Sequence, residues 1–312
     1  NRLNPRINLF VILFHFIVNY TIKFRFTTFR PFFFPLISII ILAGLACSPA
    51  AVMLAHNPDM AKTSFKYFTE RAEKKIAKSP NDPKKLIAGC TSLTQLGFGF
   101  TMEEADRLVM EDYKGGKALY VSANEAFSKA VSYGDRALEI KYPGYLAWVK
   151  GESNKSPKFV EEDIHYLFWT AGAYGGAIKS SRGNPKWVIL LPRVGKLLES
   201  ALALNPDWNK GALYSGLISY TMTRHDAPLN KIEIAASYFE KAVDASNGLD
   251  LGPYIAMAES VCIPTQNKNE FTNLLYKALN IDINSDPDLR LTNQINLNRT
   301  QWLLDNIDEF FY

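Results

Sequence analysis

Apolar residues recur every three or four positions along most of this chain, which places them on one face of an α-helix. The clearest example begins at Glu161, and its apolar face consists of Ile164, Leu167, Phe168 and Ala171. Gly183-Asn184-Pro185 predicts the end of this helix. A second helix is predicted up to Leu204, before Asn205-Pro206, and a third begins near Asp207. Helices separated by such short breaks are typical of an array of α-hairpins.

The same periodicity predicts helices through the rest of the chain. They cover residues 59–79, 83–96, 102–114, 118–140, 231–247, 251–262, 270–281 and 290–310. No stretch alternates with period two, so an all-α fold is predicted. Two helices also carry the apolar spacing of tetratricopeptide repeats, in the sets Val194, Leu198, Ala201, Pro206 and Ala235, Phe239, Ala242. The predicted architecture is a compact superhelical array of tetratricopeptide-like helical hairpins.

The first 46 residues differ from the rest in composition. They contain five basic residues, no acidic residue, and two apolar runs at 9–18 and 32–46. This arrangement predicts a secretory signal. The sequence Leu42-Ala43-Gly44-Leu45-Ala46-Cys47 resembles a bacterial lipobox, which predicts lipidation of Cys47, and Ser48 favours release to the outer membrane. The alternative is an uncleaved anchor helix. We therefore expect a signal or anchor at 1–46, a tether at 47–58 and a helical domain at 59–312.

Charge and motif content exclude several classes of function. Taking the five N-terminal basic residues from 35 leaves 30 basic against 31 acidic residues, so the body has no basic surplus for nucleic acid. No histidine or cysteine has metal-ligand spacing, and no phosphate-binding or nucleophile motif occurs, so we predict no metal, no cofactor and no enzyme activity. Cys90 and Cys262 could pair, but two buried thiols are the favoured interpretation.

Aromatic and basic residues of the central helices form the candidate ligand site. Apolar walls with a few polar groups suit a small organic ligand. The aromatic candidates are Trp169, Tyr174, Trp208, Tyr214 and Tyr220. Lys179 and Arg182 could bind a carboxylate. The competing interpretation is core packing for the aromatic residues and solvated charges for the two basic ones. Glu103, Glu104, Asp106 and Arg107 are expected to form a solvated helix face.

Residues from about 79 to 312 resemble the TatT family, the T component associated with tripartite ATP-independent periplasmic (TRAP) transporters. The likeness rests on segments at 103–108 (EEADRL), 133–144, 162–178, 191–220, 237–246 and 288–311 (DLRLTNQINLNRTQWLLDNIDEFF). The resemblance implies a periplasm-facing lipoprotein that forms a homotrimer, binds the periplasmic substrate-binding P subunit and helps to pass a ligand. The alternative function is a repeat scaffold for envelope assembly or secretion machinery.

Overall fold

The computed structural model describes residues 49–312. The predicted signal at 1–46 and Cys47 lie outside the described residues. The all-α prediction is confirmed, since the described part of the chain contains helices and no strand. The α-helices are α3 (Pro49–His56), α4 (Pro58–Lys78), α5 (Pro83–Leu96), α6 (Glu103–Glu111), α7 (Tyr113–Lys141), α8 (Tyr145–Lys150), α9 (Ile164–Ser180), α10 (Pro185–Val188), α11 (Leu191–Leu204), α12 (Ala212–Thr223), α13 (Lys231–Ala245), α14 (Gly252–Met257), α15 (Lys268–Leu279) and α16 (Arg290–Asp305).

Short helical segments of other types join these helices. Two are π-helices, η1 (Gly97–Met102) and η4 (Ala258–Cys262). Three are 3-10 helices, η2 (Glu161–Asp163), η3 (Trp208–Gly211) and η5 (Ile307–Glu309). η1 continues from α5 into α6, and η4 continues from α14. The periodicity in the sequence did not indicate either π-helix.

Local sequence explains where several helices begin. Side chains of Asn57, Asp82, Asp112 and Asn267 accept hydrogen bonds from backbone amides in the first turns of α4, α5, α7 and α15. Asp112 has an extended backbone, so it divides the predicted 102–114 helix and starts α7 five residues earlier than 118. The helix predicted from 207 begins at Ala212, because the three residues before it have positive φ angles.

The apolar interior is divided into two clusters. The N-terminal core extends from Ile76 to Tyr220 and includes the contacts among α5, α7 and α9. The C-terminal core extends from Ile218 to Phe311. α12 contributes to both. Cys90 lies in the first core and Cys262 in the second as free, buried thiols, which confirms the favoured interpretation of these residues.

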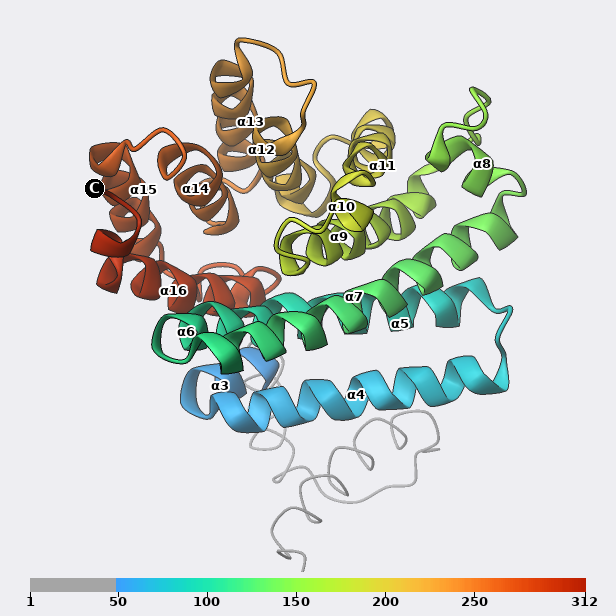
Figure 1. The fold of residues 1–312 in the computed structure, drawn as a ribbon, viewed down its shortest axis with the longest axis horizontal. Helices are drawn as coiled ribbons and strands as arrows, with labels where there is room; N and C mark the ends of the chain where they lie inside the picture. Colours follow the sequence, from blue (N-terminus) through green and yellow to red (C-terminus); the bar gives the residue numbers. More distant parts are fainter. Residues whose placement is uncertain (1–48) are drawn as a thin grey trace, which may run out of the picture. The chain divides into compact units, whose positions relative to one another are not determined.

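The two ends of the described chain meet. Figure 1 shows the helices following one another around an arc, with α16 returning to lie beside α3. A small cluster of Leu54, Ala61 and Phe100, with Leu291 and Ile295 packed against it, joins these ends. Residues 47–58, predicted as a tether, contain α3, whose Leu54 is buried in that cluster. We call the contact of α3, η1 and α6 with α16 and η4 the closing seam.

Candidate functional site

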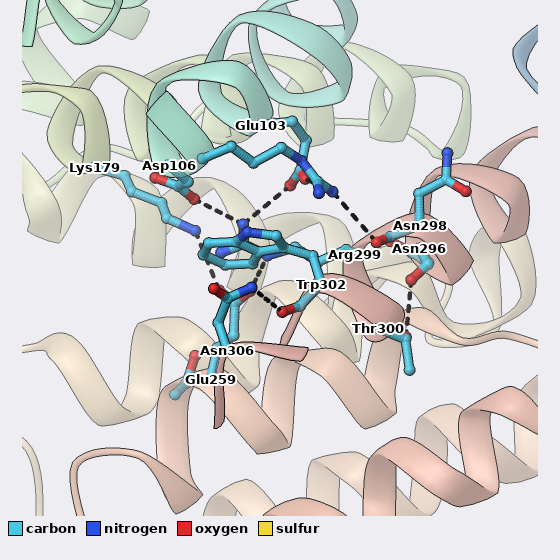
Figure 2. Close-up of polar contacts among 12 residues, drawn as sticks. Glu103, Asp106, Lys179, Glu259, Asn296, Asn298, Arg299, Thr300, Trp302 and Asn306 are labelled. Atoms are coloured by element: carbon cyan, nitrogen blue, oxygen red, sulfur yellow. Dashed lines mark hydrogen bonds and ion pairs between the residues drawn. The ribbon is translucent and has the colours of Figure 1, made fainter. Parts of the chain in front are cut away.

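A buried arginine occupies the centre of the closing seam. Arg299 on α16 has a side chain only 10% exposed. Its Nη1 lies 2.9 Å from Asp106 Oδ2 and 3.3 Å from Glu103 Oε1, and its Nε donates a hydrogen bond to Glu259 Oε1 at 2.6 Å (Figure 2). One guanidinium therefore joins α6, η4 and α16. We call Glu103, Asp106, Glu259 and Arg299 the Arg299 cluster.

Further charged and aromatic groups surround the Arg299 cluster. Lys179 Nζ on α9 lies 3.2 Å from Glu259 Oε2. Arg107 donates to both Glu103 and the backbone carbonyl of Asn298, each at 3.3 Å. The Trp302 ring has the guanidinium carbon of Arg299 4.4 Å from its centre and that of Arg107 5.5 Å from it. Each carboxylate of the cluster therefore faces at least one cation, as buried charges require.

The neighbouring helix α7 adds a second layer on the Asp106 side. The Tyr120 hydroxyl donates a hydrogen bond of 2.5 Å to Asp106 Oδ1. The guanidinium carbon of Arg182 lies 4.8 Å from the centre of the Tyr120 ring. The carboxylate of Asp106 is thus held between a buried arginine and a tyrosine hydroxyl.

Both π-helices lie at the Arg299 cluster. η1 ends at Met102, immediately before Glu103, and Glu259 lies within η4. An inserted π turn rotates the residues that follow it around the helix axis, and such turns are frequent at functional sites. Glu103 and Asp106 follow one π-helix and Glu259 lies within the other, so backbone irregularities help to position all three carboxylates that contact Arg299.

The pKa values of Glu259 and Glu103 are shifted in opposite directions. Burial pushes the pKa of Glu259 upward, but the charges of Lys179 and Arg299 outweigh burial and hold that pKa at about 2. At Glu103 burial prevails over Arg299 and Arg107, and its pKa is raised. Burial opposes the charged form of Arg299, yet Glu259, Glu103 and Asp106 raise its pKa above the usual value. Glu259 is thus held in its charged form, whereas burial favours the neutral form of Glu103.

The seam also carries a pocket of about 400 Å³, next to the Arg299 cluster. Its walls come from α3, α4, η1, α6 and α16, so it exists only where the chain ends meet. Its lining includes apolar Phe100, Ile295 and Trp302 and the paired charges Lys62 and Glu104, which are 2.6 Å apart. The volume lies within the range of small-molecule sites.

The sequence-predicted site residues occupy several separate places. Lys179 and Arg182 lie beside the Arg299 cluster. Trp169 and Trp208 both contact Phe168, with ring centres 5.3 Å and 5.0 Å from it. The structure therefore brings two of the predicted aromatic residues together and places the two basic residues elsewhere.

The three predicted tyrosines lie apart from one another. Tyr174 is fully buried and donates a 2.5 Å hydrogen bond to Asp135, whose pKa is raised by burial. Tyr214 stacks on Tyr238 with ring centres 5.9 Å apart. Tyr220 is buried and its ring packs under Arg224, 5.1 Å from the guanidinium carbon.

The expected solvated face at residues 103–107 is wrong in part. The side chains of Glu103 and Asp106 are only 20% and 11% exposed, because Arg299 covers them. Helical periodicity could not reveal this, since the partner arginine lies almost two hundred positions away. One signal was present: EEADRL and the segment containing Arg299 were among those carrying the family resemblance.

The geometry brings together charges that stabilise a closed array. In the described part of the chain no group of three or more histidine, cysteine or acidic residues is arranged to hold a metal ion. Among the same residues, no helix combines the length and apolar character needed to cross a membrane. Fold and site together define an all-helical protein in which a buried ion-pair network joins α6 to η4 and α16.

Comparison with known families identifies the chain further. The family model described as "TRAP transporter T-component" matches residues 57–311, and the chain belongs to this family. This family consists of transporter accessory components and is not an enzyme family. The chain is also similar to an uncharacterised protein of Treponema pallidum (strain Nichols), with 24% identity over 217 residues, covering 68% of this chain and 67% of that protein.

Proposed function

We propose that this protein is a periplasm-facing lipoprotein that assists TRAP-type solute uptake by binding the transporter's solute-binding subunit. The observation that carries the proposal is the T-component match over residues 57–311, which spans nearly all of the described helices. The chain is an accessory component that acts by association, and its partner is the periplasmic P subunit. Its hairpins are tetratricopeptide-like, a class of array that presents extended binding surfaces.

Crosslinking in cells tests the association. A tag at the exposed C-terminal Tyr312 leaves the folded body intact. After crosslinking and detergent extraction, we expect a TRAP-type solute-binding protein to be recovered with the tagged chain. The same tag on an unrelated lipoprotein is the control for non-specific capture. Recovery of envelope-assembly or secretion proteins in place of a solute-binding protein would favour the scaffold function.

Lipid attachment at Cys47 is the second part of the proposal. The lipobox-like sequence ends at Cys47, and the first described helix begins at Pro49. We expect Cys47→Ser to abolish incorporation of labelled palmitate and to release the protein from outer-membrane fractions. Retention of the variant in membranes would favour an uncleaved N-terminal anchor.

The proposed ligand is a small organic or apolar molecule, and the proposed assembly is a homotrimer. Trp169 and Trp208, joined through Phe168, form an aromatic group in which both tryptophans are partly exposed. Native mass spectrometry of gently purified protein tests both proposals. A trimer mass with bound ligand is expected, and Trp169→Ala is expected to reduce ligand occupancy more than Tyr214→Ala. A monomer without bound mass would contradict both.

A further inference from the structure

The closing seam is unusual for an array of hairpins. In such arrays each hairpin normally contacts only its neighbours. Here α16 contacts α3, although these helices lie at opposite ends of the described chain. The α3–α16 contact is additional to the contacts between successive helices. Its loss therefore leaves the packing of each helix on its neighbours in sequence intact.

The two large cores do not extend across the closing seam. The N-terminal core ends at α12 and the C-terminal core begins there. The apolar cluster that crosses the seam is small: its buried residues are Leu54, Ala61 and Phe100, and Leu291 and Ile295 pack against them. Opening the seam therefore exposes far less apolar surface than unfolding either core, and its free-energy cost is correspondingly smaller.

Arg299 makes two ion pairs across the seam, and Arg107 adds a hydrogen bond to the backbone carbonyl of Asn298. Glu103 and Asp106 belong to the N-terminal side, while Arg299 and Glu259 belong to the C-terminal side. Lys179 adds a second cross-contact from α9 to Glu259. Charged groups that separate into water regain hydration, whereas apolar groups do not, so an ionic seam opens more readily than an apolar one of equal area.

We propose that the Arg299 cluster is an ionic latch. It holds the closing seam shut in the resting protein, and its release lets the C-terminal core move away from α6 and α3 about the contacts at α12. Opening separates Lys179 from Glu259 and takes apart the walls of the seam pocket. The inference concerns the chain alone and does not depend on the transport function.

Distance measurement between two spin labels tests the latch in the full chain. Lys66 on α4 and Thr292 on α16 are exposed and lie on opposite sides of the seam. Both are replaced by cysteine in a Cys47→Ser background, where Cys90 and Cys262 remain buried and unlabelled. We expect a dominant short distance and a minor longer one. A reference pair at Lys66 and Glu125 reports on the N-terminal core alone.

Arg299→Met is the decisive variant. It leaves Glu103, Asp106 and Glu259 facing one another without their shared cation. We expect the longer distance to increase at least about ten-fold in population, since removing one partner of a buried ion pair is strongly destabilising. Arg224→Met, which removes ion pairs to the exposed side chains of Asp226 and Glu199, is the matched control and should leave both distances unchanged.

The result is interpretable even if Arg299→Met does not fold. Raising NaCl from about 0.1 M to about 1 M shortens the screening length from about 10 Å to about 3 Å. Because the side chains of Lys179 and Arg107 are nearly half exposed, the wild-type longer population should rise with salt. A single distance that neither salt nor a folded Arg299→Met variant changes overturns the latch. A change that also affects the reference pair overturns it too, because it indicates general unfolding.

Discussion

The contact between α7 and α9 and the closing seam join helices by opposite means. Between α7 and α9, glycines replace side chains so that backbones approach closely. A Cβ on Gly176 would overlap the Phe127 ring, and a Cβ on Gly134 would overlap Thr170. At the seam, long charged side chains span the distance and meet at Arg299. α7 and α9 are thus held together by shape and apolar burial, whereas α6 is held to α16 largely by charge.

This difference teaches where each part of the molecule is sensitive to change. Close packing is disturbed by added or removed volume, because interiors are as dense as organic crystals. An ion-pair network is disturbed by loss of one partner, because the remaining charge stays buried. The predictions below use volume changes in the first region and charge changes in the second.

The largest effect is expected from Phe127→Ala. Phe127 is fully buried and contacts Gly97 and Gly176, so truncation leaves a cavity that two helices cannot fill. We expect a loss of about 3–5 kcal/mol in the free energy of unfolding, measured by chemical denaturation. Phe98→Ala is the control, since Phe98 packs on the same ring but is 37% exposed, and its loss should be smaller. Equal losses of stability in the two variants would mean that the close packing around Phe127 adds nothing to the free energy of unfolding.

At the seam, Glu259→Gln should cost about 1.5–3 kcal/mol at neutral pH, because it removes the charge that Arg299 and Lys179 share. Glu240→Gln, on an exposed part of α13, is the control and should have little effect. Denaturation curves of both variants against wild type measure the difference.

The cost of Glu259→Gln should also depend on pH. The pKa of Glu259 is lowered from 4.5 to about 2 in the folded protein, so the folded state binds fewer protons than the unfolded state between these values. The stabilisation is complete above about pH 4.5 and is lost as pH falls through about 2. The difference between wild type and variant should therefore shrink across this interval. A difference that stays constant with pH would mean that Glu259 contributes no charge interaction.

Two adjacent glycines of α9 give a matched test of close packing. Gly176→Ala should cost about 1–3 kcal/mol, because its methyl group would overlap the Phe127 ring. Gly175 has no atom within 4 Å of an added Cβ, so Gly175→Ala should stabilise the helix by about 0.5–1 kcal/mol. Thermal and chemical denaturation measure both. Effects of the same sign at both positions would contradict the α7–α9 packing.

The smallest effect is expected from Arg224→Ala. This arginine pairs with Asp226 and Glu199, both more than half exposed, and its guanidinium lies over the Tyr220 ring. Exposed ion pairs contribute little to the free energy of unfolding, because water screens them. If Arg224→Ala lowered the free energy of unfolding as much as Glu259→Gln, buried ion pairs at the seam would contribute no more to stability than exposed ones.

The sequence by itself determined most of the longer helices, but it assigned α3 to a tether and did not predict α8. Apolar periodicity located α4, α9, α13 and α15 to within a few residues, because a helix is built from interactions three or four positions apart. It also indicated the family, through segments that the T-component match then covered. It missed the irregular turns: neither the π-helices η1 and η4 nor the left-handed residues before α12 leave a mark in the apolar pattern.

Only the tertiary structure decided which distant residues meet. The pattern of residues 103–107 was that of a solvated helix, yet Glu103 and Asp106 are covered by Arg299 from the other end of the described chain. Trp169, Tyr174 and Tyr220 looked like one aromatic set but face different neighbours. The physical reason is that helix periodicity encodes which face is buried, whereas the partner of a charge depends on how the whole array curves back on itself.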